Sequence, residues 1–172
     1  LPIYNLTGPI PKQLFGASSL SITLNLARNR LIGSLPLEIG SLKTLVELDL
    51  SENEFSGEIP STLGSCFGLQ NLYFEGNFFE GTIPASLGSL RGIQTIDLSR
   101  NNFSGQVPMF LGDFNLTRLN LSFNNFEGNV PTKGVFANLS AISVTGNARL
   151  CGGVDELKLP KCNFPIRKRR KM

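Results

Sequence analysis

The segment LDLSENEFSGEIP, residues 48–60, decides the fold because closely similar segments occupy four other places in the chain. These segments are LNLARNRLIGSLP (24–36), LYFEGNFFEGTIP (72–84), IDLSRNNFSGQVP (96–108) and LNLSFNNFEGNVP (119–131). Their shared asparagine recurs every 24 or 23 residues, at Asn29, Asn53, Asn77, Asn101 and Asn124, and Asn147 continues the series. Such a period is typical of a solenoid, in which three or more units together bury a core.

Each half of the repeat predicts its own local structure. Before the asparagine, apolar residues such as Leu48 and Leu50 alternate with polar ones, which predicts a short strand with one buried face. Strands that recur in the same sense form a parallel sheet whose polar positions face solvent. The asparagine amide can bond backbone groups that the following turn leaves unpaired.

The second half of the repeat predicts a packed spine and a bend. An apolar residue, phenylalanine in four of the five repeats, lies two positions after the asparagine and can stack from coil to coil. A glycine follows where the chain bends. An apolar residue and a proline come next, and they predict a short extended piece that begins the outer face. The columns are Leu31, Phe55, Phe79, Phe103 and Phe126, then Gly33, Gly57, Gly81, Gly105 and Gly128, then Pro36, Pro60, Pro84, Pro108 and Pro131.

The Gly-x-[Ile/Val]-Pro column resembles the plant-specific class of leucine-rich repeat, which occurs in plant receptor kinases, receptor-like proteins and polygalacturonase inhibitors. The resemblance implies an α/β fold, a right-handed solenoid with a parallel β-sheet on the concave face and short extended and 3-10 segments on the convex face. The repeats would fill residues 1–147, with a partial first repeat, about five full repeats and a terminal one. The family's amino-terminal cap with paired cysteines is not seen, and we expect an uncapped first coil to self-associate.

The three cysteines divide into one buried thiol and one predicted disulfide. Cys66 occupies the repeat position that Leu42, Leu90 and Phe114 fill elsewhere, which predicts a buried, reduced side chain. Cys151 and Cys162 remain, and a bridge between them would close the last coil within a cap at residues 148–165.

The carboxyl-terminal segments GNVPTKGVFANLSAISVTGN (128–147) and NARLCGGVDELKLPKCNFP (147–165) resemble the end of an ectodomain. The similar ectodomains belong to the group of plant receptor kinases that includes the rice bacterial-blight resistance receptor and the elongation factor Tu receptor. The resemblance implies that a transmembrane helix and a cytoplasmic Ser/Thr kinase follow in the parent protein. Residues 166–172, which contain the run RKRRK, would then be a basic juxtamembrane tail.

The composition argues against catalysis and against nucleic-acid binding. The chain has no histidine, which removes the commonest general base and metal ligand. Carboxylate pairs such as Glu52 and Glu54 lie on a turn without a phosphate-binding loop or a metal-ligand spacing, so we expect no catalytic residue, metal or cofactor. The formal charge of +3 reflects the basic tail, without which 11 basic residues face 13 acidic ones.

Five Asn-x-Ser/Thr sequons favour a secretory compartment and predict glycosylation, at Asn5, Asn102, Asn115, Asn120 and Asn138. Together with the resemblance, they indicate a plant protein on the extracellular side of the plasma membrane. Asn120 lies on a predicted strand, where a glycan would cover the sheet beside Phe123.

The polar positions of the predicted strands are the candidate binding surface, since rigid strands can present variable side chains to a peptide or protein. Tyr73 and Phe123 rank highest, because exposed aromatic residues often anchor interfaces. The candidates for ligand or co-receptor contact are Tyr73, Glu75, Asp97, Ser99, Arg100, Arg118, Asn120, Ser122, Phe123, Ser143 and Thr145.

Three functions are compatible with this sequence. The first is an extracellular recognition module of a plant pattern-recognition or peptide receptor kinase, which binds a peptide or protein ligand, a co-receptor kinase ectodomain, or both. The alternative is a secreted inhibitor of a pathogen's cell-wall hydrolase, and a truncated product without a partner is the third. The basic tail after residue 165 favours the receptor.

Overall fold

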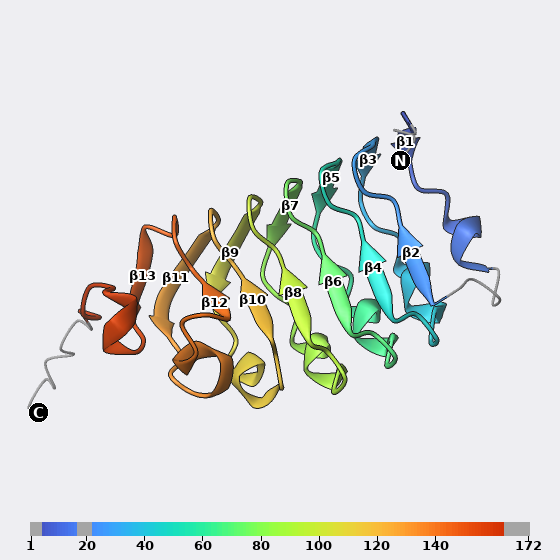
Figure 1. Cartoon of the computed structure of the whole chain (residues 1–172). Coiled ribbons are helices and arrows are strands. Elements are labelled where there is room, and N and C mark those ends of the chain that lie inside the picture. Colours follow the sequence, from blue (N-terminus) through green and yellow to red (C-terminus); the bar gives the residue numbers. More distant parts are fainter. Residues whose placement is uncertain (1–4, 17–21, 164–172) are drawn as a thin grey trace, which may run out of the picture.

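The chain forms a row of stacked coils, and a typical coil passes through two β-strands and one short 3-10 helix (Figure 1). The structure is a computed structural model that describes residues 5–16 and 22–163. The predicted juxtamembrane tail, residues 166–172, lies outside the described residues. Within the described ranges, no helix is long and apolar enough to span a bilayer.

The first strands of the coils form a parallel sheet on the concave face, which we call the inner sheet. Leu48 lies opposite Leu72, and Leu72 lies opposite Ile96, so that the buried residues of neighbouring strands are in register. We number the coils by these strands, so that coil 1 contains β2 and coil 6 contains β12. In the described part of the chain the inner strands are β2 (Thr23–Asn25), β4 (Glu47–Asp49), β6 (Asn71–Tyr73), β8 (Thr95–Asp97), β10 (Arg118–Asn120) and β12 (Ile142–Ser143).

The second strands form another parallel sheet, the outer sheet, which begins earlier in each repeat than the sequence predicts. Pro84 has extended dihedral angles but precedes a 3-10 helix, whereas the strand before it already ends at Gly81 with a φ of 76°. This left-handed conformation favours glycine and turns the chain out of the sheet. The outer strands are β1 (Thr7–Pro9), β3 (Arg30–Gly33), β5 (Glu54–Gly57), β7 (Phe78–Gly81), β9 (Asn102–Gln106), β11 (Asn125–Val130) and β13 (Arg149–Gly152).

Short 3-10 helices form the third side of the coils and point apolar residues such as Leu63, Leu87 and Leu111 into the core. The predicted combination of a parallel sheet with extended and 3-10 segments is therefore confirmed. The helices are η1 (Lys12–Gly16), η2 (Leu37–Ser41), η3 (Ser61–Ser65), η4 (Ala85–Ser89), η5 (Met109–Asp113), η6 (Gly134–Ala137) and η7 (Asp155–Leu157).

The repeated asparagines join each coil to the one before it. Asn77 Nδ2 donates to the carbonyl oxygens of Leu50 at 3.0 Å and Phe74 at 3.1 Å, and its Oδ1 accepts the backbone N–H of Phe55 at 3.0 Å. Leu50 and Phe55 belong to the preceding coil. Because the amide satisfies backbone groups of two coils, its removal would leave buried donors and acceptors unpaired, at a cost of about 1–3 kcal/mol each.

The predicted phenylalanine spine is present and fully buried. Phe55, Phe79, Phe103 and Phe126 stack in sequence, with ring centroids 5.9, 6.2 and 6.3 Å apart. Phe74 adds a contact of 4.8 Å with Phe79 from the inner strand side. Stacked rings of this kind contribute about 0.5–1.5 kcal/mol beyond their buried area.

The cysteines have the roles that the repeat predicts. Cys66 is buried and free, and burial raises the pKa of its thiol to about 11, although Lys43 acts in the opposite direction. Cys151 and Cys162 form a disulfide with a Cα–Cα distance of 5.0 Å. The bridge ties β13 to the chain segment near Pro160, whose carbonyl also accepts the backbone N–H of Gly152 at 2.9 Å.

Candidate functional site

The inner face is shaped by the short turn that joins each inner strand to its asparagine, which we call the strand-end turn. In coil 4, Asp97 Oδ1 accepts hydrogen bonds from the backbone N–H of Ser99 at 3.0 Å and from its hydroxyl at 2.6 Å. Coils 2 and 5 repeat this arrangement with Asp49 and Ser51, and with Asn120 and Ser122. The strand thus ends in a closed polar turn whose hydrogen bonds are local.

The sequence-based placement of Asp97, Ser99 and Ser122 on the exposed surface is wrong. These residues are only 4%, 5% and 6% exposed, because the strand-end turn folds their polar groups against the backbone. Asp97 Oδ2 also accepts hydrogen bonds from Arg118 at 3.2 Å and from Asn120 Nδ2 at 3.1 Å. The Asx-Leu-Ser tripeptide that recurs at these turns was the signal that could have revealed this burial.

Coil 3 departs from this turn. Tyr73 takes the place of the Asx residue and offers no carboxylate or amide to the residues that follow. Glu75 takes the place of the serine, and its carboxylate accepts the backbone N–H of Glu75 itself. Its oxygen Oε2 is buried without a hydrogen-bond partner. The Asx-to-serine pairing of coils 2, 4 and 5 is therefore absent from coil 3, and an incompletely bonded carboxylate lies there instead.

The environment of Glu75 opposes its ionisation. Burial raises the pKa of the Glu75 carboxyl group above the ordinary value of 4.5, while its own backbone N–H acts in the opposite direction. The negative charges of Asp97, Asp49 and Glu52 raise the pKa further. A carboxyl group with neighbours of the same charge and a desolvated oxygen favours its neutral form.

A salt bridge spans coil 3 beside Glu75. Arg100 of coil 4 reaches over Gly76 and pairs with Glu52 of coil 2. Gly76 permits this close approach, since a Cβ atom there would lie 2.6 Å from Glu52 Oε1, and its φ of 68° also favours glycine. The predicted contact set included Arg100 but missed Glu52 and Gly76. The sequence YFEGN in place of the Asx-Leu-Ser pattern was the available signal.

The carboxyl-terminal end of the inner face has an exposed arginine and an exposed phenylalanine. The side chain of Arg118 is 62% exposed, and Phe123 as a whole residue is 58% exposed. The Phe123 ring leans over Gly146, where a Cβ atom would lie only 2.5 Å from the ring. Ser143 and Thr145 are accessible in coil 6, and a hollow of about 210 Å³ lies between Arg118, Asn120 and Ser143. This end therefore brings five predicted contact residues together.

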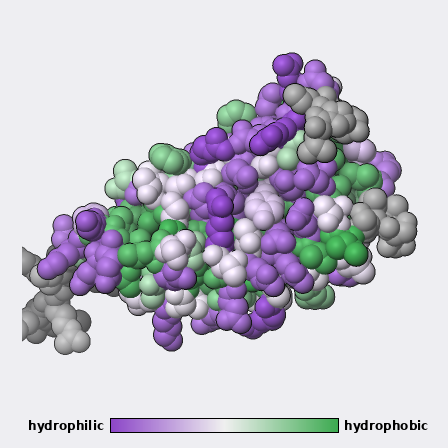
Figure 2. Space-filling view, in the orientation of Figure 1, coloured by the Kyte–Doolittle hydropathy of each residue, from purple (hydrophilic) through white to green (hydrophobic). Residues whose placement is uncertain are grey.

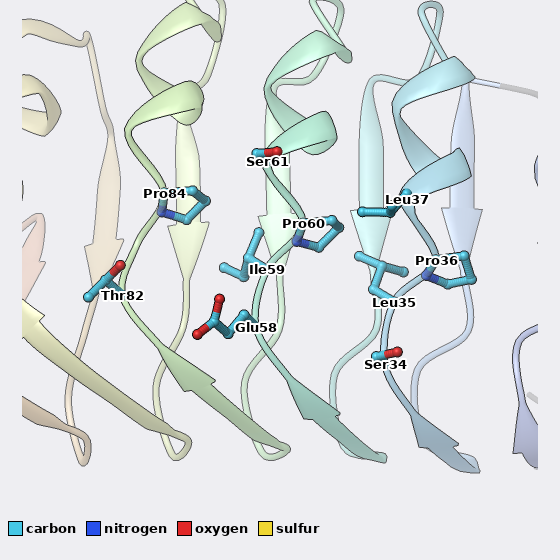
Figure 3. Close-up of a pocket in the computed structure, with 10 residues that line it drawn as sticks. All are labelled: Ser34, Leu35, Pro36, Leu37, Glu58, Ile59, Pro60, Ser61, Thr82 and Pro84. Carbon is cyan, nitrogen blue, oxygen red and sulfur yellow. The ribbon is translucent and has the colours of Figure 1, made fainter.

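Polar side chains cover the middle of the face shown in Figure 2, and hydrophobic patches lie toward both ends of the solenoid. A larger groove of about 600 Å³ lies away from the predicted contact residues. It is lined by the segments that join outer strands to 3-10 helices, with Pro36, Pro60 and Pro84 along it (Figure 3). Glu58 is the only ionisable residue in its lining, so the groove offers no set of catalytic groups.

Within residues 5–16 and 22–163, no group of three His, Cys, Asp or Glu side chains is placed to hold a metal ion. Asn5, Asn102, Asn115 and Asn138 are exposed, as a glycosylated residue must be, whereas Asn120 is partly buried and its Nδ2 donates to Asp97. Glycosylation at these five sites stays a prediction.

Comparisons with known proteins agree with this arrangement. Over 38 residues, the chain is 53% identical to the receptor kinase-like protein Xa21 of Oryza sativa subsp. japonica. This match covers 22% of this chain and 4% of that protein. The leucine-rich repeat ectodomain of the receptor kinase GASSHO1/SCHENGEN3 from Arabidopsis thaliana, solved with CASPARIAN STRIP INTEGRITY FACTOR 2, is 35% identical with a TM-score of 0.79. That match covers 92% of this chain and 18% of the ectodomain.

A second solved structure is the Arabidopsis receptor kinase HAESA with the peptide hormone IDA and the co-receptor SERK1. It is 29% identical with a TM-score of 0.63, over 88% of this chain and 33% of that one. The chain thus spans a small part of the length of these relatives. Five segments match the Leucine Rich Repeat family, at residues 22–42, 44–66, 68–90, 92–114 and 115–133. Because these segments cover more than half of the sequence, the chain belongs to the leucine-rich repeat family and is similar to the ectodomains of plant receptor kinases.

Proposed function

We propose that the chain is an extracellular recognition segment of a plant receptor kinase. Its inner sheet binds a peptide or protein ligand, and its last coils and cap contact a co-receptor ectodomain. The observation that carries this proposal is the departure of coil 3 from the strand-end turn, which places Tyr73 and Glu75 on the inner face of a scaffold similar to peptide-bound ectodomains. Stability alone does not require this departure, because coils 2, 4 and 5 keep the closed turn in the same scaffold.

The geometry of the inner sheet suits an extended ligand. Parallel strands about 4.8 Å apart present side chains at regular steps, which matches the extended peptide mode of recognition. Tyr73 in coil 3 and Arg118 and Phe123 in coil 5 are residue types that dominate binding energy at interfaces. Asp97, Ser99 and Ser122 support the turns beneath these residues and are removed from the proposed contact set.

The parent protein is proposed to be a membrane-anchored Ser/Thr receptor kinase that faces the extracellular space. The similarity to Xa21 and to solved receptor ectodomains supports this proposal, as do the sequons and the disulfide. The transcript beyond the codon for Met172 tests it. An apolar run of about twenty residues, followed by a kinase domain, is expected. A stop codon instead would overturn the receptor proposal and favour a secreted inhibitor.

Surface plasmon resonance on the parent ectodomain tests the contact residues. We expect the SERK1 ectodomain to bind in the presence of a plant or microbial peptide fraction that activates the receptor, and to bind the isolated chain much more weakly. Phe123→Ala and Arg118→Glu should each lower the co-receptor affinity about tenfold or more, which corresponds to about 1.4 kcal/mol or more. The melting temperature of Phe123→Ala should change little, whereas Arg118→Glu loses the ion pair with the buried Asp97 and should melt at a somewhat lower temperature.

Phe67→Ala is the matched control, because Phe67 is 62% exposed but lies outside the inner strands. If Phe123→Ala and Arg118→Glu bind SERK1 as well as the parent protein does, coil 5 is not part of the interface. Tight inhibition of a fungal polygalacturonase by the chain would instead support the inhibitor function, which the similarities reported above do not favour.

A further inference from the structure

Glu75 is the carboxylate of the inner face that the surrounding hydrogen bonds leave incomplete. Its Oε2 atom is buried and has no partner. Asp49 on one side accepts hydrogen bonds from Ser51 and Asn25, and Asp97 on the other side accepts them from Ser99, Asn120 and Arg118. The carboxylates of the neighbouring strands therefore have several hydrogen-bond donors, while Glu75 receives only its own backbone N–H.

The cations near Glu75 are already engaged with other carboxylates. Arg100 from coil 4 pairs with Glu52 of coil 2, and Arg118 from coil 5 pairs with Asp97. The Glu52 carboxylate lies so close to Gly76 that a Cβ atom there would approach it to 2.6 Å. Glu75 thus faces Asp49 and Glu52 from coil 2, and Asp97 and Arg100 from coil 4, with more negative than positive charge around it.

We propose that coil 3 is a proton-responsive element of the inner face. As the pH falls from neutral, Glu75 takes up a proton from solvent on its carboxylate, and the strip between Asp49 and Asp97 loses one negative charge. The protonation of Glu75 does not depend on the proposed function. Its effect on ligand binding rests on the proposed function, in which this strip faces the ligand.

The chemistry of the protonated form explains why the proton is retained above the usual pH. The neutral form of a carboxylic acid needs less solvation than the anion, so a buried Oε2 without a hydrogen-bond partner is less costly in the neutral form. Protonation also removes one of several like charges from a partly desolvated site. Both effects act in the direction of the raised pKa of the Glu75 carboxyl group.

The consequence for a ligand is a change in the preferred charge over coil 3. With Glu75 ionised, a cationic group beside Tyr73 meets the full negative charge of the strip. With Glu75 protonated, the same group meets one charge less, and a neutral group is favoured relative to it. A ligand with a basic side chain at this position would therefore bind more weakly in acid than at neutral pH.

The tyrosine content of the chain provides a direct test. The protein has no tryptophan and two tyrosines, so that Tyr4→Phe leaves Tyr73 as the sole source of tyrosine fluorescence. A nearby ionised carboxylate quenches tyrosine emission, and we expect the Tyr73 fluorescence of Tyr4→Phe to change with a midpoint above pH 4.5, the ordinary glutamate value. The transition should disappear when Glu75→Gln is added. It should remain when Glu80→Gln is added instead, because Glu80 is exposed on the outer sheet of the same coil.

A second measurement removes dependence on the fluorophore. The side-chain carboxyl carbon of Glu75, assigned in NMR spectra by its absence in Glu75→Gln, should titrate with a midpoint above 4.5. A midpoint at or below 4.5 would overturn the proposal, as would a fluorescence transition that persists in Glu75→Gln. Neither experiment uses a ligand, so a failure here leaves the proposed receptor function untouched, and a failure to bind SERK1 leaves the proton-responsive element untouched.

Discussion

Coils 3 and 4 share one interior but have different strand-end turns. Both bury a phenylalanine of the spine, and both have an asparagine that donates to a backbone carbonyl of the preceding coil. Coil 4 then closes its turn with Asp97 and Ser99, whereas coil 3 has Tyr73 and Glu75 at the same places. The interior is constrained because spine rings such as Phe79 and Phe103 stack on the rings of both neighbouring coils. The side-chain pairing that closes the turn of coil 4 lies within the turn itself, so coil 3 can lack this pairing without loss of the fold.

The largest difference is expected between a shared interior residue and an exposed one. Phe103→Ala should lower the free energy of unfolding by about 3–5 kcal/mol, because it empties a fully buried spine position between Phe79 and Phe126. Phe123→Ala removes a ring that is 58% exposed and should cost far less. Denaturant titration measures the free energy of unfolding of both variants. Equal losses would mean that a buried spine phenylalanine stabilises the fold no more than an exposed one.

The cap should contribute the next largest effect. Replacing Cys151 and Cys162 by serine removes a bridge with a sequence separation of 11 and should lower the free energy of unfolding by about 2–3 kcal/mol. Cys66→Ala is the control for cysteine replacement as such. Mass mapping of the parent protein under non-reducing conditions should find the Cys151–Cys162 bridge and a free Cys66. A linkage of Cys66 to either cap cysteine would contradict the coil assignment.

The closed turn of coil 4 should give a smaller but measurable effect. Ser99→Ala removes a buried hydroxyl that donates to Asp97, and we expect a loss of about 0.5–1.5 kcal/mol in the free energy of unfolding. Ser61→Ala, at an exposed position of η3, is the matched control and should be neutral. A neutral Ser99→Ala would show that the turn is held by its backbone hydrogen bonds alone.

The repeat made the interior predictable, while the strand-end turns were less accessible to sequence reasoning. The positions of Asn77 and Phe79 in the repeat predict the inner strand, the buried spine and the inward-facing amide. The same positions in the other repeats carry the same residue types, which supports each prediction. Polar residues at alternate strand positions were expected to be exposed, but Ser99 folds back onto Asp97, and alternation cannot distinguish these cases. The second sheet was missed because its hydrogen bonds are made by backbone upstream of Pro84, where the side-chain pattern carries no strand signal.

The smallest expected effect is the pH dependence of stability that Glu75 gives to coil 3. The pKa of this carboxyl group is raised in the folded protein above the ordinary value of 4.5, so folding favours the protonated form. Below pH 4.5 both folded and unfolded chains carry the proton, and the favourable contribution is fully present. As the pH rises through the folded-state pKa, Glu75 ionises in its unfavourable site and that contribution is lost.

Glu75→Gln should therefore be more stable than the parent protein at pH 7, and this advantage should shrink as the pH falls toward 4.5. The amide resembles the protonated acid in shape and is neutral at every pH. Urea unfolding at a series of pH values measures the difference, with Glu80→Gln as the control that should show no such trend. A Glu75→Gln variant that is less stable at neutral pH and equal in acid would show that the ionised carboxylate stabilises coil 3. Such a result would mean that ionised Glu75 stabilises the folded protein. The carboxylate of coil 3 would then be as well hydrogen-bonded as that of coil 4.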